Sequence, residues 1–131
     1  MTSHGFYERP LPARGSDGFF HPTSEGELVR LVRAARLEGV KLRVRGSAHS
    51  VARAIYTQDG EGVEPGRRRH FDVMLDRYIG VTFDDARMRV TVQAGCHLGH
   101  DPRDPTRTAT WENSLLAQLE KRGWALPDLG L

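Results

Sequence analysis

A helix followed at once by a strand is the feature that most limits what this 131-residue chain can fold into. In "SEGELVRLVRAARLEGV", Ser24 and Glu27 form a capping-box pattern, in which a hydroxyl and a carboxylate each satisfy an orphan backbone N–H. The apolar residues then recur at helical spacing: Leu28, Leu31, Val32 and Ala35. Gly39 supplies a left-handed stop. The next segment, "VKLRVR", alternates apolar and basic residues, which is typical of a strand. This order predicts an α/β fold.

Further elements are expected on both sides of this unit. Residues 1–18 carry Pro, Gly and Ser without a period, so we expect an irregular lead-in. "FDVML" predicts a short strand, and "YIGVTFDDARMRVTVQAG" predicts a β-hairpin around the turn "DDAR", with Met88, Val90 and Val92 on the return strand. "TWENSLLAQLEKRG" predicts a helix with Thr110 as its N-cap and Gly123 as its stop. Its core face would be Trp111, Leu115, Leu116 and Leu119. The expected fold is a small mixed sheet flanked by helices.

Composition excludes several classes of protein. With 38% hydrophobic and 27% charged residues, the chain matches a folded domain rather than a disordered one. A net charge of +2 predicts no strong field for nucleic acid. No apolar run approaches the ~18–20 residues that a membrane span needs. The first twenty residues lack the apolar core of a secretion signal, and the single cysteine, Cys96, fits a reducing compartment. We therefore expect a cytoplasmic protein with no membrane and no nucleic-acid partner.

The loop after the first strand carries the most specific motif. It reads "RGSAHS", that is Arg45, Gly46, Ser47, Ala48, His49 and Ser50. Small residues let backbone N–H groups converge on phosphate oxygens without side chains in the way. Alternatively, these are ordinary turn residues, and His49 caps the turn. Arg45 is either the last polar residue of the strand or a contact to phosphate or to the loop itself.

The order of these parts resembles a known family. A helix, a strand, "RGSAHS", a hairpin ending in "VTVQAG", a second helix and then "GWALPDLG" are similar to the N-terminal part of the PCMH-type FAD-binding domain of the vanillyl-alcohol oxidase and p-cresol methylhydroxylase superfamily. Within it, FAD-linked oxidases of the aldonolactone, alditol and sterol-oxidase kind look nearest. The resemblance covers residues 19–131, which would form the first subdomain of such a domain.

The resemblance implies FAD as the cofactor. The loop would wrap the FAD pyrophosphate, and His49 would be placed to bond covalently to the flavin 8α-methyl carbon. Neutral imidazole is a competent nucleophile near pH 7. Ala94 and Gly95, in "QAG", are weaker candidates for contact with the flavin. The implied cofactor-binding set is therefore Arg45, Gly46, Ser47, Ala48, His49, Ser50, Ala94 and Gly95.

Two departures from the family limit what the resemblance implies. Relatives usually carry Gly where this chain has Ala48; if that position needs a positive φ, alanine costs roughly 1 kcal/mol or more. Relatives also continue after "LPDLG" with a Thr/Gly-rich segment and a substrate domain that holds the catalytic base. The expected function is thus the FAD-binding portion of an oxidoreductase acting on an alcohol or lactone-type substrate. The chain would be truncated, or a split subunit that a second chain completes, and inactive alone.

Other functions stay open at this stage. The same fold could serve as a non-catalytic interaction module, with Trp111 or Trp124 in the core or on a docking surface. Cys96, His97 and His100 could bind a metal, but structural zinc normally has four ligands from two separated segments, so we expect no metal and a partly buried free thiol. "GRRRH", residues 66–70, is expected to be a solvated loop rather than a nucleic-acid site.

Overall fold

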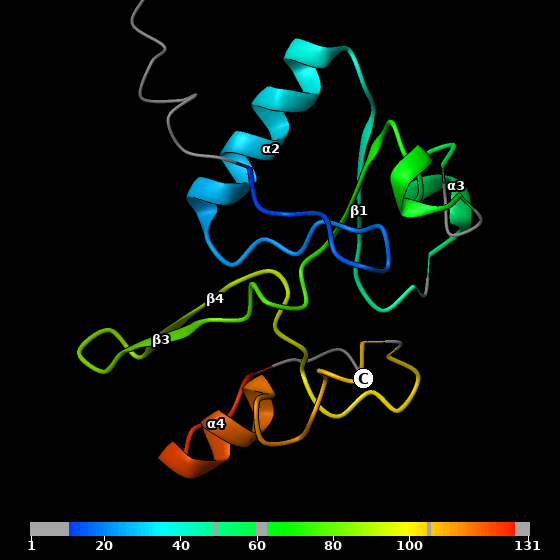
Figure 1. Ribbon diagram of the computed structural model, residues 1–131. Helices are drawn as coiled ribbons and strands as arrows, with labels where there is room; N and C mark the ends of the chain where they lie inside the picture. The colour runs from blue at the N-terminus through cyan, green and yellow to red at the C-terminus, as the bar shows by residue number, and fades with distance from the viewer. Residues whose placement is uncertain (1–10, 49, 60–62, 105, 128–131) are drawn as a thin grey trace, which may run out of the picture.

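The computed structural model describes residues 11–48, 50–59, 63–104 and 106–127. Its helices and strands are, in chain order, α2 (Glu25–Glu38), β1 (Leu42–Arg45), α3 (Ala52–Ile55), the 3-10 turn η1 (Pro65–Arg67), β2 (Phe71–Met74), β3 (Val81–Asp84), β4 (Arg89–Val92) and α4 (Leu115–Arg122), shown in Figure 1. The expected mixed α/β class is confirmed. The boundary between an irregular lead-in, residues 1–18, and the domain, residues 19–131, stays a prediction.

Helix α2 begins and ends where its sequence predicts. The Ser24 Oγ accepts a hydrogen bond from the N–H of Glu27 at 3.2 Å, and the Glu27 carboxylate accepts one from the N–H of Thr23 at 2.6 Å. Gly39 closes the helix with a φ of 66°, in the left-handed region that favours glycine. On the expected apolar face Leu31 and Ala35 are buried, but Val32 is 55% exposed, so the face is narrower than its spacing predicts.

Strand β2 is the centre of the larger sheet, which consists of β1, β2 and a bridging segment at Phe20. It pairs in parallel with β1, in a register that sets Leu42 opposite Phe71 and Arg45 opposite Met74. On its other side, a parallel bridge joins Phe20 to β2: the Phe20 N–H donates to the Asp72 carbonyl, and the Met74 N–H donates to the Phe20 carbonyl, both at 2.9 Å. All four residues of β2 are buried, as expected of a strand with neighbours on both sides.

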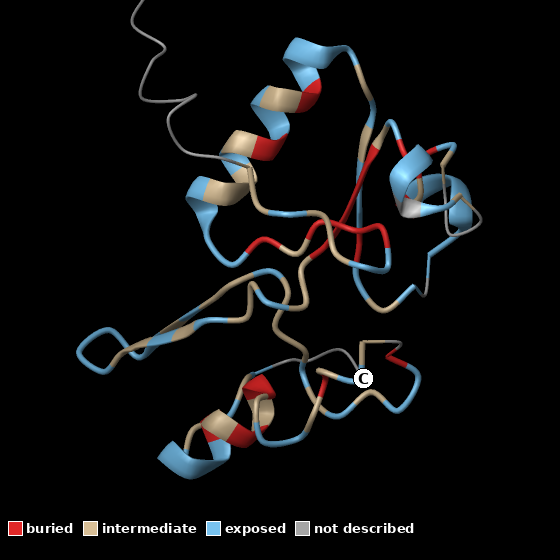
Figure 2. Ribbon diagram, in the orientation of Figure 1, coloured by how far each residue is buried: buried red, intermediate tan, exposed pale blue. Residues whose placement is uncertain are grey.

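The main hydrophobic core lies between this sheet and α2. Phe20, Leu31, Ala35, Phe71 and Val73 form it. The rings of Phe20 and Phe71 are 4.9 Å apart at a tilt of 59°. Figure 2 shows this buried layer in red along β2, the N-terminal segment and one side of α2. Fully burying each large side chain stabilises the fold by about 1.5–3 kcal/mol.

The far end of β1 departs from simple alternation. Val44 is 40% exposed, whereas Arg45 is only 3% exposed. Arg45 is buried because α3 and Tyr56 cover that face: its Nη1 donates to the Tyr56 hydroxyl at 2.9 Å. Its Nε donates to the Gly46 carbonyl at 3.2 Å, so the guanidinium also braces the start of the following loop.

Strands β3 and β4 form the expected antiparallel hairpin, with Val81 opposite Val92 and Asp84 opposite Arg89. Met88, expected on the return strand, lies in the turn instead, with a φ of 52° and 67% of its surface exposed. The hairpin packs against the chain after α4, where Phe83 meets Trp124 edge to face at 5.3 Å. This contact places Trp124 in the fold rather than leaving it free for docking.

Helix α4 begins four residues later than its sequence predicts. Its N-cap is Ser114, whose Oγ accepts from the N–H of Ala117 at 3.2 Å. Thr110 instead accepts from the N–H of Asn113 at 3.3 Å, in a separate turn before the helix. Trp111 therefore lies outside the helix and is 45% exposed. The prediction that Trp111 lies on the core face of the helix was wrong. Leu115 and Leu119 are buried, and Gly123 ends the helix, as expected.

The basic loop at residues 66–70 is only partly solvated. Arg67 and Arg69 are exposed, but Arg68 is buried, with its guanidinium 5.2 Å from the Phe19 ring centroid. Its Nη1 lies 3.7 Å from the Asp72 carboxylate, which has no exposed surface. The expectation of a wholly solvated loop was wrong at Arg68, because this residue neutralises a buried carboxylate. Across the described ranges, no helix has both the length and the apolar character to span a membrane.

Candidate functional site

Three parallel segments end at the same edge of the larger sheet. The carboxyl ends are those of the Phe20 segment, of β1 and of β2. Open α/β sheets bind ligands at this edge. Two adjoining cavities lie there, of about 540 and 180 Å³. They share four lining residues: Arg45, Met74, Asp76 and Thr106.

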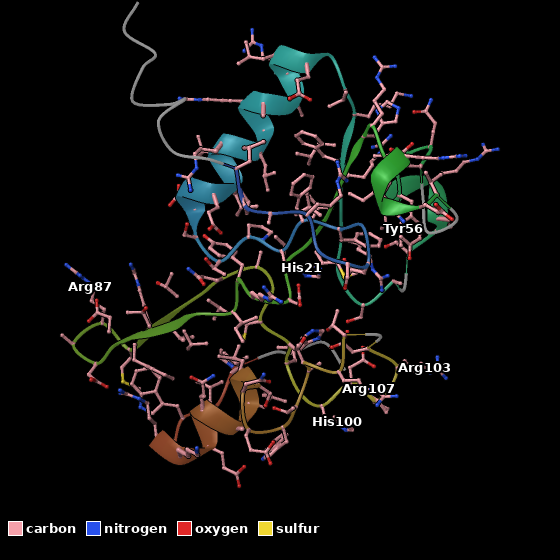
Figure 3. All side chains as sticks on the ribbon, viewed as in Figure 1. His21, Tyr56, Arg87, His100, Arg103 and Arg107 are labelled. Carbon is pink, nitrogen blue, oxygen red and sulfur yellow. The ribbon has the colours of Figure 1, made fainter. Side chains whose placement is uncertain are left out.

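His21, labelled in Figure 3, is one of the residues that line the larger cavity. Its Nδ1 is hydrogen-bonded to Asp76, and its Nε2 is 2.8 Å from the Asp17 carboxylate. One carboxylate at each ring nitrogen holds the imidazole between two acidic side chains. The contact ties the end of the Phe20 segment to the residues that follow β2. Sequence reasoning missed this site, because no motif links residues 17, 21 and 76.

The smaller cavity brings together most of the residues expected to bind the cofactor. Arg45, Gly46 and Ser47 line it from one side, and Ala94 and Gly95 line it from the other. Ala48 and Ser50 are exposed and do not line it. His49 lies outside the described residues, so its place relative to the cavity is a prediction only. The loop and the "QAG" segment are thus neighbours across one cavity, although 42 residues lie between them in the chain.

The loop is open rather than packed by the chain itself. A Cβ placed on Gly46 would have no neighbouring atom within 4 Å. Ala48 has a φ of 64°, so the position adopts the left-handed conformation that favours glycine. Within the described part of the chain, the backbone N–H groups of Ser47 and Ala48 donate no hydrogen bond. Such a turn with free N–H groups is a fit for a phosphate group.

Gly95 is required for a different reason than contact with a cofactor. A Cβ there would lie 1.7 Å from the carbonyl oxygen of Leu75, a backbone atom that cannot move aside. The N–H of Gly95 donates to the Tyr78 carbonyl at 2.9 Å. Glycine therefore lets the turn after β4 pack directly on the residues that follow β2. This close approach forms the smaller cavity.

His97 is a second lining residue whose place sequence reasoning missed. Its Nδ1 is 3.4 Å from the Ser47 hydroxyl, so it meets the loop from the opposite side of the smaller cavity. From the sequence alone, His97 is considered only as a metal ligand together with Cys96 and His100. No group of three or more His, Cys, Asp or Glu within the described ranges is arranged to hold a metal. Cys96 is a half-buried free thiol, as expected, and burial raises its pKa.

Asp104 organises the loop that closes the two cavities at Thr106. Its carboxylate accepts hydrogen bonds from the Thr106 hydroxyl at 2.8 Å and from the N–H groups of Thr106, Thr108 and Ala109 at 2.9–3.1 Å. Burial acts to raise the pKa of Asp104, but these hydrogen bonds outweigh it, and the pKa lies below its ordinary value of 3.8. Asp104 therefore holds Thr106 in place as a carboxylate.

Together these features define an α/β domain with two adjoining cavities at the carboxyl edge of a parallel sheet. The family model described as an FAD binding domain matches residues 16–100, more than half of the chain. This chain belongs to that family, the PCMH-type FAD-binding domains, and the expected resemblance is confirmed. Family membership supports FAD as the cofactor. No curated protein matches the chain.

Replacing Ala48 by glycine should stabilise the protein. Ala48→Gly removes the cost of a left-handed alanine and should raise the free energy of unfolding by about 1 kcal/mol, as measured by urea denaturation. Ala54→Gly makes the same chemical change within α3 and should lower stability by about 0.5–1 kcal/mol. If both variants lose stability, the loop does not adopt this conformation in solution.

Asp104 should make stability depend on pH. Because its pKa is lower in the folded than in the unfolded state, its contribution is full above pH 3.8 and is lost as the pH falls through the folded pKa. Asp104→Asn leaves N–H groups without an acceptor and should cost about 1–3 kcal/mol near pH 7. The variant's stability should then fall less than that of the parent chain between pH 5 and acid conditions, as followed by urea denaturation at each pH. Parallel pH profiles would contradict this role.

Proposed function

We propose that this chain is the FAD-binding portion of an FAD-dependent oxidoreductase that oxidises an alcohol or lactone-type substrate. One observation carries the proposal: the loop at Gly46 is open, and the "QAG" segment lines the same cavity at the carboxyl edge of the sheet. When bound, FAD supplies the redox chemistry, accepting a hydride from the substrate. The protein supplies the binding surface and its electrostatics.

The loop residues would bind the pyrophosphate. The N–H groups of Ser47 and Ala48 have no acceptor among the described residues, and Gly46 leaves space beside them. Arg45 lines both cavities and adds positive charge at this edge. The Ser47 hydroxyl, already 3.4 Å from His97, offers a further polar contact. Roles for Ser50 and Ala94 stay predictions.

His49 would attach the flavin covalently. One of its ring nitrogens would bond to the 8α-methyl carbon with loss of one proton from each partner, and two electrons would pass through the flavin to an oxidant such as dioxygen. Support comes from the chain position of His49, between Ala48 of the open loop and Ser50. Attachment would prevent loss of the cofactor.

The 131-residue chain alone is proposed to have no appreciable turnover. A substrate base must be free to take a proton. Of the three carboxylates that line the cavities, Asp17 and Asp76 are hydrogen-bonded to His21, and Asp104 accepts hydrogen bonds on both oxygens. None of the three is arranged as such a base. Completion by a second chain and a cytoplasmic location stay predictions.

Filling the open space at Gly46 tests the position of the cofactor. Gly46→Val should weaken FAD binding at least about tenfold, or ~1.4 kcal/mol, because the new side chain would occupy the cofactor's place. Thermal unfolding without FAD should hardly change, since nothing lies within 4 Å and φ is not left-handed. FAD fluorescence titration measures the affinity. Gly66→Val, at another open glycine in η1, is the matched control. Equal FAD affinity in both variants would place the cofactor elsewhere.

Covalent attachment is tested by acid precipitation. Protein expressed with its flavin and precipitated in acid should keep the yellow colour in the pellet. His49→Ala should release the flavin into the supernatant while still binding added FAD, because the loop backbone is unchanged. Ser50→Ala should behave like the parent chain. A colourless pellet from the parent chain would limit the proposal to non-covalent binding.

A further inference from the structure

A third cavity lies away from the carboxyl edge, between β1 and α3. Its volume is about 530 Å³. Lys41 precedes β1 and Arg43 lies within it; two positions apart, they share one face of the strand. Figure 1 shows α3 standing beside β1. The lining includes Lys41, Arg43, Arg53, Tyr56, Thr57 and Gln58.

The charge around this cavity is positive and uncompensated. Lys41, Arg43 and Arg53 are all exposed, and none of them forms an ion pair within the described part of the chain. No carboxylate belongs to the described lining. Three like charges around one hollow repel one another, and an anion placed among them would remove that repulsion.

The nearest carboxylate on the sheet does not neutralise them. Asp72 is opposite Arg43 in the register of β1 and β2. It is fully buried, and its oxygens accept from the Thr57 N–H at 2.7 Å and the Thr57 hydroxyl at 2.6 Å. Arg68 lies 3.7 Å from it. Its charge is thus engaged inside the fold, and Arg43 is left to the solvent side.

The rest of the lining can hold a small organic molecule in place. The Tyr56 ring is half-buried, and its hydroxyl is fixed by the hydrogen bond from Arg45. Lys and Arg side chains contribute apolar stems as well as charged ends. Small-molecule sites have about 300–1,000 Å³, which includes this cavity. A nucleic-acid strand would need a longer track with several stacking rings, and Tyr56 is the only aromatic residue of the described lining.

We propose that this concave basic surface is a second anion site, separate from the flavin site, which binds a small phosphorylated molecule. Guanidinium groups bind phosphate oxygens in pairs, and an ammonium group adds a third cation. The site does not depend on FAD binding. Tyr56 contacts Arg45, which lines both cavities at the carboxyl edge, so the two sites share one hydrogen bond.

The test is a titration of the full 131-residue chain with inorganic pyrophosphate at low salt, followed by amide NMR. Saturable shifts are expected at residues 41–43 and 53–58, and shifts at Gly46 and Ser47 would report the flavin loop separately. Arg43→Gln and Arg53→Gln should each weaken the affinity read at residues 41–58 about tenfold, as expected for loss of a charge-assisted hydrogen bond. Both side chains are exposed, so the fold should be kept.

Arg89→Gln is the matched control, because it removes the same charge from the exposed side of β4. It should leave the affinity unchanged. The proposal is overturned if residues 41–43 and 53–58 show no saturable shift, or if Arg89→Gln weakens binding as much as the other two variants. A single-stranded oligonucleotide that binds much more tightly than pyrophosphate through Arg43 and Arg53 would also overturn the stated class of ligand.

Discussion

The parallel pairing of β2 with both of its neighbours is the constraint on which the rest of the structure depends. The Phe20 segment and β1 hydrogen-bond to opposite sides of β2, so three carboxyl ends meet at one edge. Such short strands are stable only when both faces are covered, and α2 covers one of them with Leu31 and Ala35. The cavities at the edge follow from this pairing, because each strand end leads into a separate loop.

The buried Arg45 links the sheet to the loop that follows it. A guanidinium with 3% exposure is tolerated only when its N–H groups have acceptors. The Tyr56 hydroxyl and the Gly46 carbonyl provide two of them. The first places α3 against β1, and the second fixes the direction in which the loop leaves the strand. One side chain therefore sets the geometry of the loop and of the basic surface beside α3.

The sequence was sufficient to predict those helices and strands whose ends are fixed by residues within the same segment. Ser24 and Gly39 fix the ends of α2 through their own side chain and backbone, so the sequence was sufficient there. At α4 two residues could both act as N-caps; the helix begins after Ser114, where the N–H groups of Leu115 and Leu116 donate to the carbonyls of His97 and Leu98, a tertiary contact. Arg45 was left open for the same reason: its burial depends on Tyr56, eleven residues away. His21 and His97 entered the site through tertiary contacts that no spacing encodes.

The loop after β1 has two features that cost free energy: a strained backbone and N–H groups without an acceptor among the described residues. Ala48 is held at a positive φ, and the N–H groups of Ser47 and Ala48 have no acceptor among the described residues. A backbone kept in an unfavourable conformation is typical of functional sites, where the surrounding structure imposes it. Arg45 fixes the start of this loop through its hydrogen bond to the Gly46 carbonyl, and the Ser47 hydroxyl lies 3.4 Å from His97 Nδ1. A bound pyrophosphate would supply acceptors for these N–H groups, which is the physical reason for proposing this loop as part of the FAD site.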